Sequence, residues 1–328
     1  MAKVCVGQWM FHLCLICMFN GLSLMTVPVM ANPLETQQVS GINSTKANLQ
    51  VSEGIAEGIY YKTFGQGQPV LIINGGPGLD SAGFESVAKT IAAKGFQTIL
   101  FDQRGTGRSS LAKIDSHSIQ MALMVEDIEK LRRHLDLPTL NILGHSFGGM
   151  LGAAYAAKYP QYVEKLIFSS AGGLDLSFRE GFAERFNAKL TLVEQTKMQA
   201  YQALQAAGDD SAATRDALAL IRAQAYVVDK SKAPAIAARL KVVNMTINSL
   251  VFADLEKINF DLKTSFQAFN APVLVLQGQN DIISVDTAQA ISKSFKDAHL
   301  VLLPNCAHYG WLDNPELYYA SIFEFLQG

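Results

Sequence analysis

The stretch Gly144-His145-Ser146-Phe147-Gly148 decides the fold of this 328-residue chain. An apolar run at residues 140–143 precedes it, and the helix-forming stretch at 150–157 follows it. This order predicts a strand, a tight turn and a helix, with the serine on the turn in a strained conformation and its hydroxyl exposed. A glycine on each side lets the strand and the helix pack closely. Ser146 is therefore a candidate nucleophile, and an ordinary Gly/Ser turn is the alternative.

Short apolar runs separated by helical patterns extend through most of the chain. The runs lie at residues 59–64, 70–73, 98–101, 140–143, 165–169, 273–277 and 300–303. Nearly continuous apolar strands that alternate with helices indicate a mostly parallel sheet covered on both faces. Residues 118–135 illustrate the helical pattern, since apolar residues recur there at helical spacing and Leu137-Pro138 closes the segment. The predicted fold class is α/β.

The alternation stops after Gly172-Gly173. Residues 174–262 are rich in Ala, Gln, Lys and Leu, with helices expected at 212–225 and 233–243 and no convincing strand. An insertion of this kind emerges at the carboxyl ends of the strands, where ligands bind in such sheets. We therefore expect a helical cap or lid between two core parts. A helical elaboration without a gating role is the alternative. The expected divisions are a leader at 1–31, core at 32–173, cap at 174–262 and core at 263–328.

Residues 1–31 have the pattern of a secretory leader. Lys3 is followed by an apolar stretch, and Val29-Met30-Ala31 suits cleavage before Asn32. An uncleaved membrane anchor is the alternative. Three of the four cysteines lie in this leader, so the remaining chain keeps only Cys306 and no internal disulfide is expected. We expect a periplasmic or extracellular protein without a stable membrane partner after cleavage.

Composition limits the expected partners and cofactors. The formal net charge is −2 and no basic cluster stands out, so nothing favours nucleic-acid binding. The six histidines are scattered without metal-ligand spacing. Gly105-Thr106-Gly107 lacks the third glycine of a dinucleotide-binding fingerprint. We expect no metal and no cofactor. The expected partner is a small molecule or a short peptide, and the sequence does not indicate an oligomeric state.

The base and the acid that would activate Ser146 are expected later in the sequence than the serine. A serine hydroxyl needs a base within hydrogen-bonding reach and an acid that orients the base. In hydrolases with this turn the acid and then the histidine follow the serine, which leaves His299 and His308. His308 is preferred because it follows the last strand, whereas His299 begins that strand. Asp281 is the preferred acid because it follows the strand at 273–277. The competing acids are Asp175, Asp286 and Asp313.

An oxyanion site must accompany the nucleophile. Backbone N–H groups stabilise the negative oxygen of the tetrahedral intermediate, and the residue after the nucleophile, Phe147, supplies one of them. The turn Asn74-Gly75-Gly76-Pro77-Gly78 follows the strand at 70–73 and is expected to supply a second through Gly75 or Gly76. An ordinary strand-to-helix turn is the alternative for this segment.

These segments together resemble the α/β-hydrolase superfamily and, within it, the proline iminopeptidase (prolyl aminopeptidase) family. The most specific one is Asp102-Gln103-Arg104-Gly105-Thr106-Gly107-Arg108-Ser109, which is similar to the family signature Asp-Gln-Arg-Gly-x-Gly-x-Ser. Asn74-Gly75-Gly76-Pro77-Gly78 is similar to the family's His-Gly-Gly-Pro-Gly turn, and residues 125–132 resemble its helix before the nucleophile strand. The resemblance implies an α/β-hydrolase fold with a cap and an exopeptidase that releases an N-terminal residue, typically proline.

The resemblance also implies that carboxylates of the cap bind the free ammonium group of the substrate. The candidates in this chain are Glu180, Glu184 and Glu194. The alternative is a solvated helix face on which Arg179 and Arg185 pair with these carboxylates.

Two departures from the family leave the substrate open. Asn74 stands where histidine is usual, and Gly144-His145-Ser146-Phe147-Gly148 differs from the Gly-Gly-Ser-Trp-Gly version of many iminopeptidases. Asp102 is expected to brace its loop by pairing with Arg104 or Arg108. The sequence predicts a serine hydrolase that forms an acyl-enzyme, with an aminopeptidase as the leading hypothesis. The alternatives are a carboxylesterase and a catalytically silent hydrolase fold that binds a small ligand.

Overall fold

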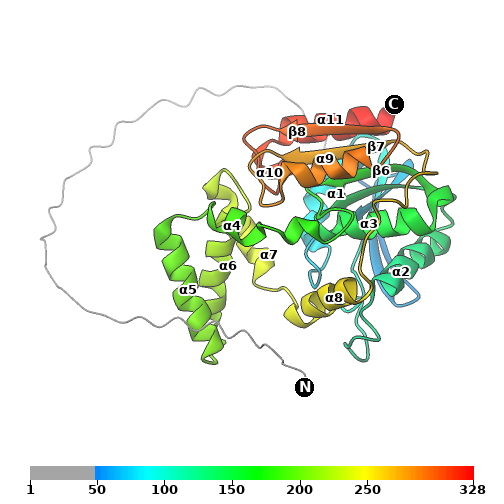
Figure 1. Cartoon of the computed structure of the whole chain (residues 1–328). Coiled ribbons are helices and arrows are strands. Elements are labelled where there is room, and N and C mark those ends of the chain that lie inside the picture. Colours follow the sequence, from blue (N-terminus) through cyan, green and yellow to red (C-terminus); the bar gives the residue numbers. More distant parts are fainter. Residues whose placement is uncertain (1–48) are drawn as a thin grey trace, which may run out of the picture. The chain divides into compact units, whose positions relative to one another are not determined.

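An eight-stranded sheet organises the residues that the computed structural model describes, 49–328 (Figure 1). Its strand order is β1-β2-β4-β3-β5-β6-β7-β8, with β1 and β2 antiparallel to their neighbours and the other pairs parallel. The strands are β1 (Val51–Ala56), β2 (Ile59–Phe64), β3 (Gln68–Ile73), β4 (Phe96–Phe101), β5 (Leu140–His145), β6 (Val163–Ser169), β7 (Val273–Gly278) and β8 (Ala298–Leu303). The leader predicted at 1–31 lies outside the described residues.

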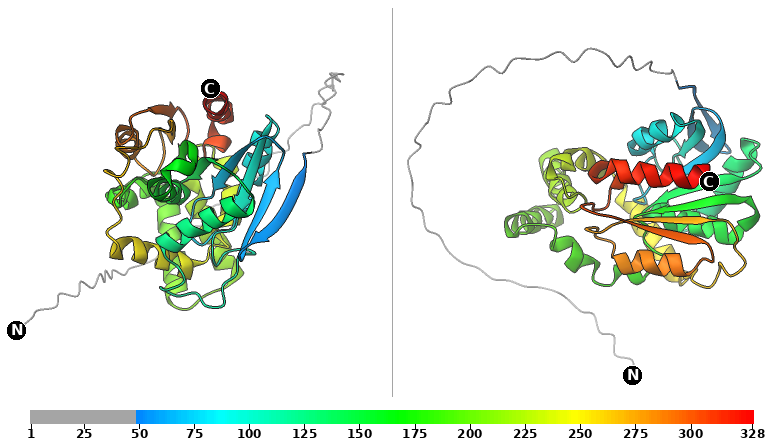
Figure 2. Two further views of the ribbon diagram at one scale, coloured as in Figure 1. Left: turned by 90° about the vertical axis from the view of Figure 1, so that its right-hand side faces the viewer. Right: turned by 90° about the horizontal axis from the view of Figure 1, so that it is seen from above.

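Both faces of the sheet are buried under helices, as the near-continuous apolar strands predict. In β3, Leu71 and Ile73 pack into one core cluster, whereas Val70 and Ile72 pack into the other. The first cluster is covered by α2 (Met121–His134), α3 (Phe147–Lys158) and α9 (Val285–Lys293), and the second by α1 (Glu85–Ala92) and α11 (Pro315–Gln327). Figure 2 shows α9 and α11 on opposite faces of the sheet.

One strand was not predicted. The first apolar run begins at residue 59, but β1 precedes it and pairs with β2 at the edge of the sheet, from Val51 opposite Phe64 to Ala56 opposite Ile59. Most of its side chains are exposed, so the segment has no apolar run. Backbone pairing rather than burial places β1 in the sheet. Each of the other strands begins and ends within two residues of its expected bounds.

The segment between β6 and β7 contains five α-helices and, in keeping with the sequence, no β-strand among its described residues. They are α4 (Phe182–Asn187), α5 (Leu192–Ala206), α6 (Ala212–Gln224), α7 (Ala233–Leu240) and α8 (Met245–Lys257). Its two ends meet, because Asp175 and Asp261 form an isolated bridge and the Leu262 N–H donates to the Leu174 carbonyl at 2.8 Å. Whether this segment moves as a lid stays a prediction.

The longest described helix, α5, has 15 residues, fewer than a typical membrane-spanning helix. Within residues 49–328, no single helix is long and apolar enough to cross a bilayer, and a bent pair, Lys230–Leu240 with Met245–Lys257, meets the length and composition criteria only jointly.

Two buried carboxylates fix the loop after β4. Asp102 accepts hydrogen bonds from the N–H and the hydroxyl of Ser81, at 2.9 and 2.8 Å, and from the N–H of Arg108 at 2.8 Å. The Arg104 guanidinium instead pairs with both carboxylate oxygens of Asp127, each at 2.7 Å. The expected pairing of Asp102 with an arginine side chain is therefore wrong, because α2 and β1 supply the partners of the two arginines.

Replacement of Arg104 by alanine is expected to destabilise the fold by about 3–5 kcal/mol, because it leaves the Asp127 carboxylate buried without its partner. Burial already raises the pKa of Asp127. Urea denaturation followed by circular dichroism measures the loss. Arg108→Ala is the matched control, since its pair with Glu53 is half-exposed on both sides and exposed pairs of this kind contribute little to stability. Equal losses in both variants would contradict this role of the buried pair.

Candidate active site

The turn between β5 and α3 holds Ser146 in a strained backbone conformation, with φ 54° and ψ −120°. A side chain at Gly144 would place its Cβ 2.4 Å from the Gly148 carbonyl oxygen, and one at Gly148 would lie 2.1 Å from the carbonyl oxygen of Ile73. Both glycines are therefore required by the close approach of strand and helix. The Ser146 N–H donates to the Ser169 carbonyl at 2.9 Å, which helps to hold the strained turn.

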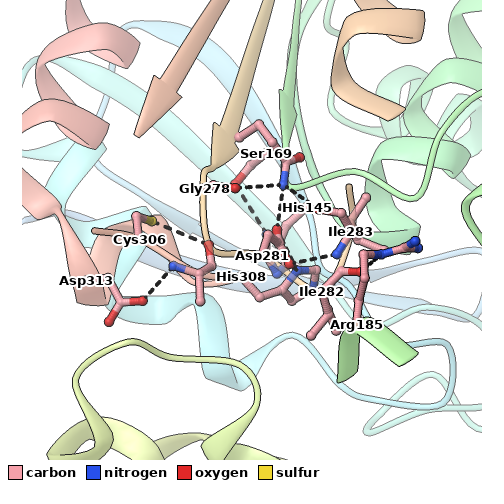
Figure 3. A network of polar contacts seen from close by, with 12 residues as sticks. His145, Ser169, Arg185, Gly278, Asp281, Ile282, Ile283, Cys306, His308 and Asp313 are labelled. Atoms are coloured by element: carbon pink, nitrogen blue, oxygen red, sulfur yellow. Dashed lines mark hydrogen bonds and ion pairs between the residues drawn. The ribbon is translucent and has the colours of Figure 1, made fainter. Parts of the chain in front are cut away.

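His308 and Asp281 lie together at the carboxyl end of the sheet (Figure 3). The Nδ1 atom of His308 is 2.9 Å from Oδ1 of Asp281 and 3.1 Å from Oδ2. Asp281 also accepts hydrogen bonds from the Gln277 side chain at 2.8 Å and the Ile283 N–H at 3.1 Å. A carboxylate at Nδ1 favours the tautomer with the proton on Nδ1, which leaves Nε2 free to act as a base.

The competing groups named from the sequence lie elsewhere or bind other partners. Asp175 pairs with Lys263 at 2.6 Å, and Asp286 is an exposed residue in the first turn of α9. Asp313 accepts hydrogen bonds from backbone N–H groups. The His299 side chain is 73% exposed. Only Asp281 among the four candidate acids contacts the His308 ring.

A cavity of about 530 Å³ brings the predicted nucleophile and base together. Ser146, Phe147, His308 and Gly76 all line it. The structure has no hydrogen bond between the Ser146 hydroxyl and His308, and such bonds in unliganded enzymes often shorten only when substrate binds. Within residues 49–328, no group of three or more His, Cys, Asp or Glu side chains is arranged to hold a metal ion.

The predicted oxyanion turn lies directly against Ser146. A Cβ added at Gly75 would be 2.7 Å from Cβ of Ser146, and Gly76 has the positive φ of 73° that favours glycine. The side chain of Asn74, fully buried, donates to the Leu79 carbonyl at 3.0 Å and so closes the turn. Phe147 is the first residue of α3, where backbone N–H groups have no partner within the helix. The geometry therefore leaves N–H groups available on both sides of the serine.

The cap segment also contacts the loop that carries His308. The His308 N–H donates to the Tyr226 carbonyl at 3.1 Å, and the two rings are 5.4 Å apart. The Asp313 carboxylate, labelled in Figure 3, accepts hydrogen bonds from the Ala307 N–H at 2.9 Å and the Val228 N–H at 3.0 Å. It therefore joins this loop to the cap. Sequence reasoning did not find these positioning contacts. Contacts made by backbone groups leave no side-chain pattern that could have revealed them.

His145, beside the predicted nucleophile, packs against the His308 ring at a centroid distance of 4.7 Å, with the two ring planes tilted by 57°. Burial holds the pKa of His145 well below its usual value, and the nearby His308 and Arg239 lower it further. Its Nδ1 lies 3.3 Å from the Ser169 hydroxyl. A neutral ring at this position packs against His308 without adding a positive charge next to it.

The architecture agrees with the comparison to known families. A family model described as the alpha/beta hydrolase fold matches residues 68–315. The chain belongs to the α/β-hydrolase family. It is a serine hydrolase of that family, and it resembles the proline iminopeptidases within it.

Individual α/β-hydrolases extend this comparison. The proline iminopeptidase of Lactiplantibacillus plantarum is 26% identical over 284 residues, which cover 81% of this chain and 96% of the relative. That of Heyndrickxia coagulans is 28% identical, with 80% and 91% covered. The solved esterase of Exiguobacterium antarcticum has a TM-score of 0.65 at 19% identity, with 82% and 96% covered. The likeness to the esterase shows the fold alone.

The three cap carboxylates predicted to bind an ammonium group do not line the cavity of this α/β-hydrolase. Glu180 and Glu184 are exposed. Glu194 caps helix α5, since its carboxylate accepts from the Thr191 N–H at 2.7 Å while its own N–H donates to the Thr191 hydroxyl at 3.2 Å. The spacing of this threonine and glutamate is a capping-box signature visible in the sequence. The ammonium-binding role stays a prediction that these positions do not favour.

Replacement of Gly75 by alanine is expected to lower kcat by about 100-fold to 1,000-fold, which is the effect of losing one oxyanion donor. The added methyl group meets Ser146 Cβ and the His145 carbonyl oxygen within 3 Å, so the turn must move away from the serine. Steady-state ester hydrolysis measures the change. Gly95→Ala is the control, because a Cβ added at that glycine, unlike one added at Gly75, has no atom within 4 Å. An unchanged kcat in Gly75→Ala would exclude this turn from the oxyanion site.

Proposed function

We propose that this serine hydrolase cleaves small carboxylic esters and amides through an acyl-enzyme on Ser146. The 2.9 Å contact between His308 Nδ1 and Asp281 carries this proposal, because it orients the imidazole of His308 at the cavity that Ser146 also lines. A serine, an oriented histidine and two sets of backbone N–H groups are the parts that acyl transfer requires.

The chemistry follows from these positions. His308 Nε2 takes the proton of the Ser146 hydroxyl as its oxygen attacks the substrate carbonyl carbon, and Asp281 stabilises the imidazolium that forms. N–H groups of Phe147 and of the Gly75-Gly76 turn bind the negative oxygen of the tetrahedral intermediate. His308 then donates the proton to the leaving alcohol or amine. Water, activated by the same imidazole, cleaves the acyl-enzyme and releases the carboxylic acid.

A second candidate, release of N-terminal proline from short peptides, is favoured by the relatives. Four of the similar chains that are named proline iminopeptidases each match at least 80% of this chain. The signature at residues 102–109 also resembles that family. The exposed positions of Glu180 and Glu184 do not favour this candidate.

A side-by-side rate measurement tests the proposal. The substrates are a short-chain aryl ester, a proline aryl amide and the N-blocked form of that amide. Turnover of the ester alone supports the first candidate, whereas preference for the free-amine amide supports the second. No turnover of any substrate, together with no labelling of Ser146 by a fluorophosphonate, would overturn the proposal in favour of a ligand-binding protein.

A further inference from the structure

Aromatic and aliphatic side chains form most of the surface above Ser146. The rings come mainly from the cap, and two isoleucines come from the loop after Asp281. These residues are Phe178, Phe182, Tyr226, Phe252, Ile282 and Ile283. The cavity volume of about 530 Å³ lies within the range of sites for small organic ligands.

The charges around this cavity are unevenly distributed. Among residues 49–328, no aspartate or glutamate lines it, and Arg179 and His308 are its only basic side chains. The carboxylate of Asp281 lies behind the His308 ring and is occupied by that ring, by Gln277 and by a backbone N–H. The wall of the cavity therefore has one arginine and no side-chain anion.

Arg179 belongs to the cap segment Ser177–Arg179 and forms an ion pair with Glu256 of α8. Its side chain is 49% exposed, so the pair lies at the outer edge of the cavity. The guanidinium is 5.9 Å from the ring of Phe252, another cavity residue on α8. A cation is thus fixed between the two parts of the cap that border the cavity.

We propose that this cavity selects apolar acyl groups without a positive charge, so that the substrates are esters or amides of neutral carboxylic acids. The inference rests on the proposed acyl-enzyme chemistry and specifies its substrate class. An ammonium group next to the scissile carbonyl would lose its water among hydrocarbon side chains without gaining a carboxylate partner. The Arg179 cation adds a weaker repulsion, because its partner Glu256 and the solvent screen part of its charge. An uncharged ring or short branched chain instead gains from burial against the same side chains.

A pair of isosteric substrates isolates the charge. Methyl cyclopentanecarboxylate and methyl prolinate have rings of the same size and differ at one ring position, where prolinate carries an ammonium group at pH 7. The acid released from each is titrated at constant pH. We expect kcat/KM for the neutral ester to exceed that for prolinate by about 100-fold or more. Equal rates, or a preference for prolinate, would overturn the inference.

The same assay separates failure of this inference from failure of the proposed function. Hydrolysis of methyl prolinate at least as fast as that of the neutral ester, and lost in Ser146→Ala, would overturn the charge selection and leave the acyl-enzyme chemistry standing. No hydrolysis of either ester, with no fluorophosphonate adduct on Ser146, would overturn both.

Variants at the cavity edge test the role of charge directly. Arg179→Gln removes the cation, and we expect the preference for the neutral ester to fall several-fold. Ala183→Glu introduces a carboxylate at a cavity-lining position and is expected to lower the same preference further. Arg215→Gln is the matched control, because Arg215 pairs with Asp210 and does not line the cavity. If Arg179→Gln and Arg215→Gln showed the same preference for the neutral ester over methyl prolinate, the contribution of the Arg179 cation would be contradicted.

Discussion

Replacement of Ser146 by alanine is expected to lower kcat for a cleaved ester by about a million-fold, because no other group can form the acyl-enzyme. The residual rate reflects binding and the oxyanion N–H groups, which do not depend on the hydroxyl. Alanine retains the backbone turn and removes only the Oγ atom, so the fold is expected to stay intact by circular dichroism. Steady-state hydrolysis of the preferred ester gives the ratio.

Ser249→Ala is the matched control for this variant. Ser249 also lines the cavity, but it lies on α8 and is not part of the turn after β5. We expect its kcat to stay close to that of the unaltered protein. If Ser146→Ala kept more than a small percentage of the activity, the nucleophile would have to be another residue.

Asp281→Asn is expected to lower kcat by about ten-thousand-fold. The side-chain amide has nearly the shape of the carboxylate, but its N–H group favours the His308 tautomer with the proton on Nε2. That tautomer cannot accept the proton of the Ser146 hydroxyl. The amide also fails to stabilise the imidazolium that forms as the serine attacks.

Asp286→Asn serves as the control for the acid. It removes an equal charge from an exposed residue in the first turn of α9, shortly after Asp281 in the sequence. We expect it to leave kcat nearly unchanged. Near-normal activity in Asp281→Asn would contradict the assigned acid, even though its carboxylate touches the His308 ring.

The strands of the parallel sheet could be predicted because burial on both faces requires continuous apolar runs. Strand β7, for example, is buried along its whole length and was expected at residues 273–277. Strand β1 was missed for the opposite reason, since most of its side chains face solvent and only pairing with β2 holds it. Sequence hydrophobicity detects burial, and it does not detect an edge strand held by backbone hydrogen bonds.

The juxtaposition of Asp281 and His308 could be predicted from chain order, because the carboxyl ends of parallel strands meet at one edge of the sheet. The partners of the loop after β4 could not be predicted. The sequence offers Arg104 several carboxylates, and only the packing of α2 brings Asp127 to it. The contacts of Tyr226 and Asp313 depend on how the cap rests on the His308 loop. No local pattern in the sequence predicts how the cap packs on this loop.

Mapping the site of a fluorophosphonate adduct by mass spectrometry tests the central claim most directly, because this reagent phosphonylates an activated serine hydroxyl. We predict one adduct, on the peptide that contains Ser146, with no adduct in Ser146→Ala and much slower labelling in His308→Ala. An adduct on a different residue, or ester hydrolysis that persists in a protein in which Ser146 is unlabelled, would contradict it.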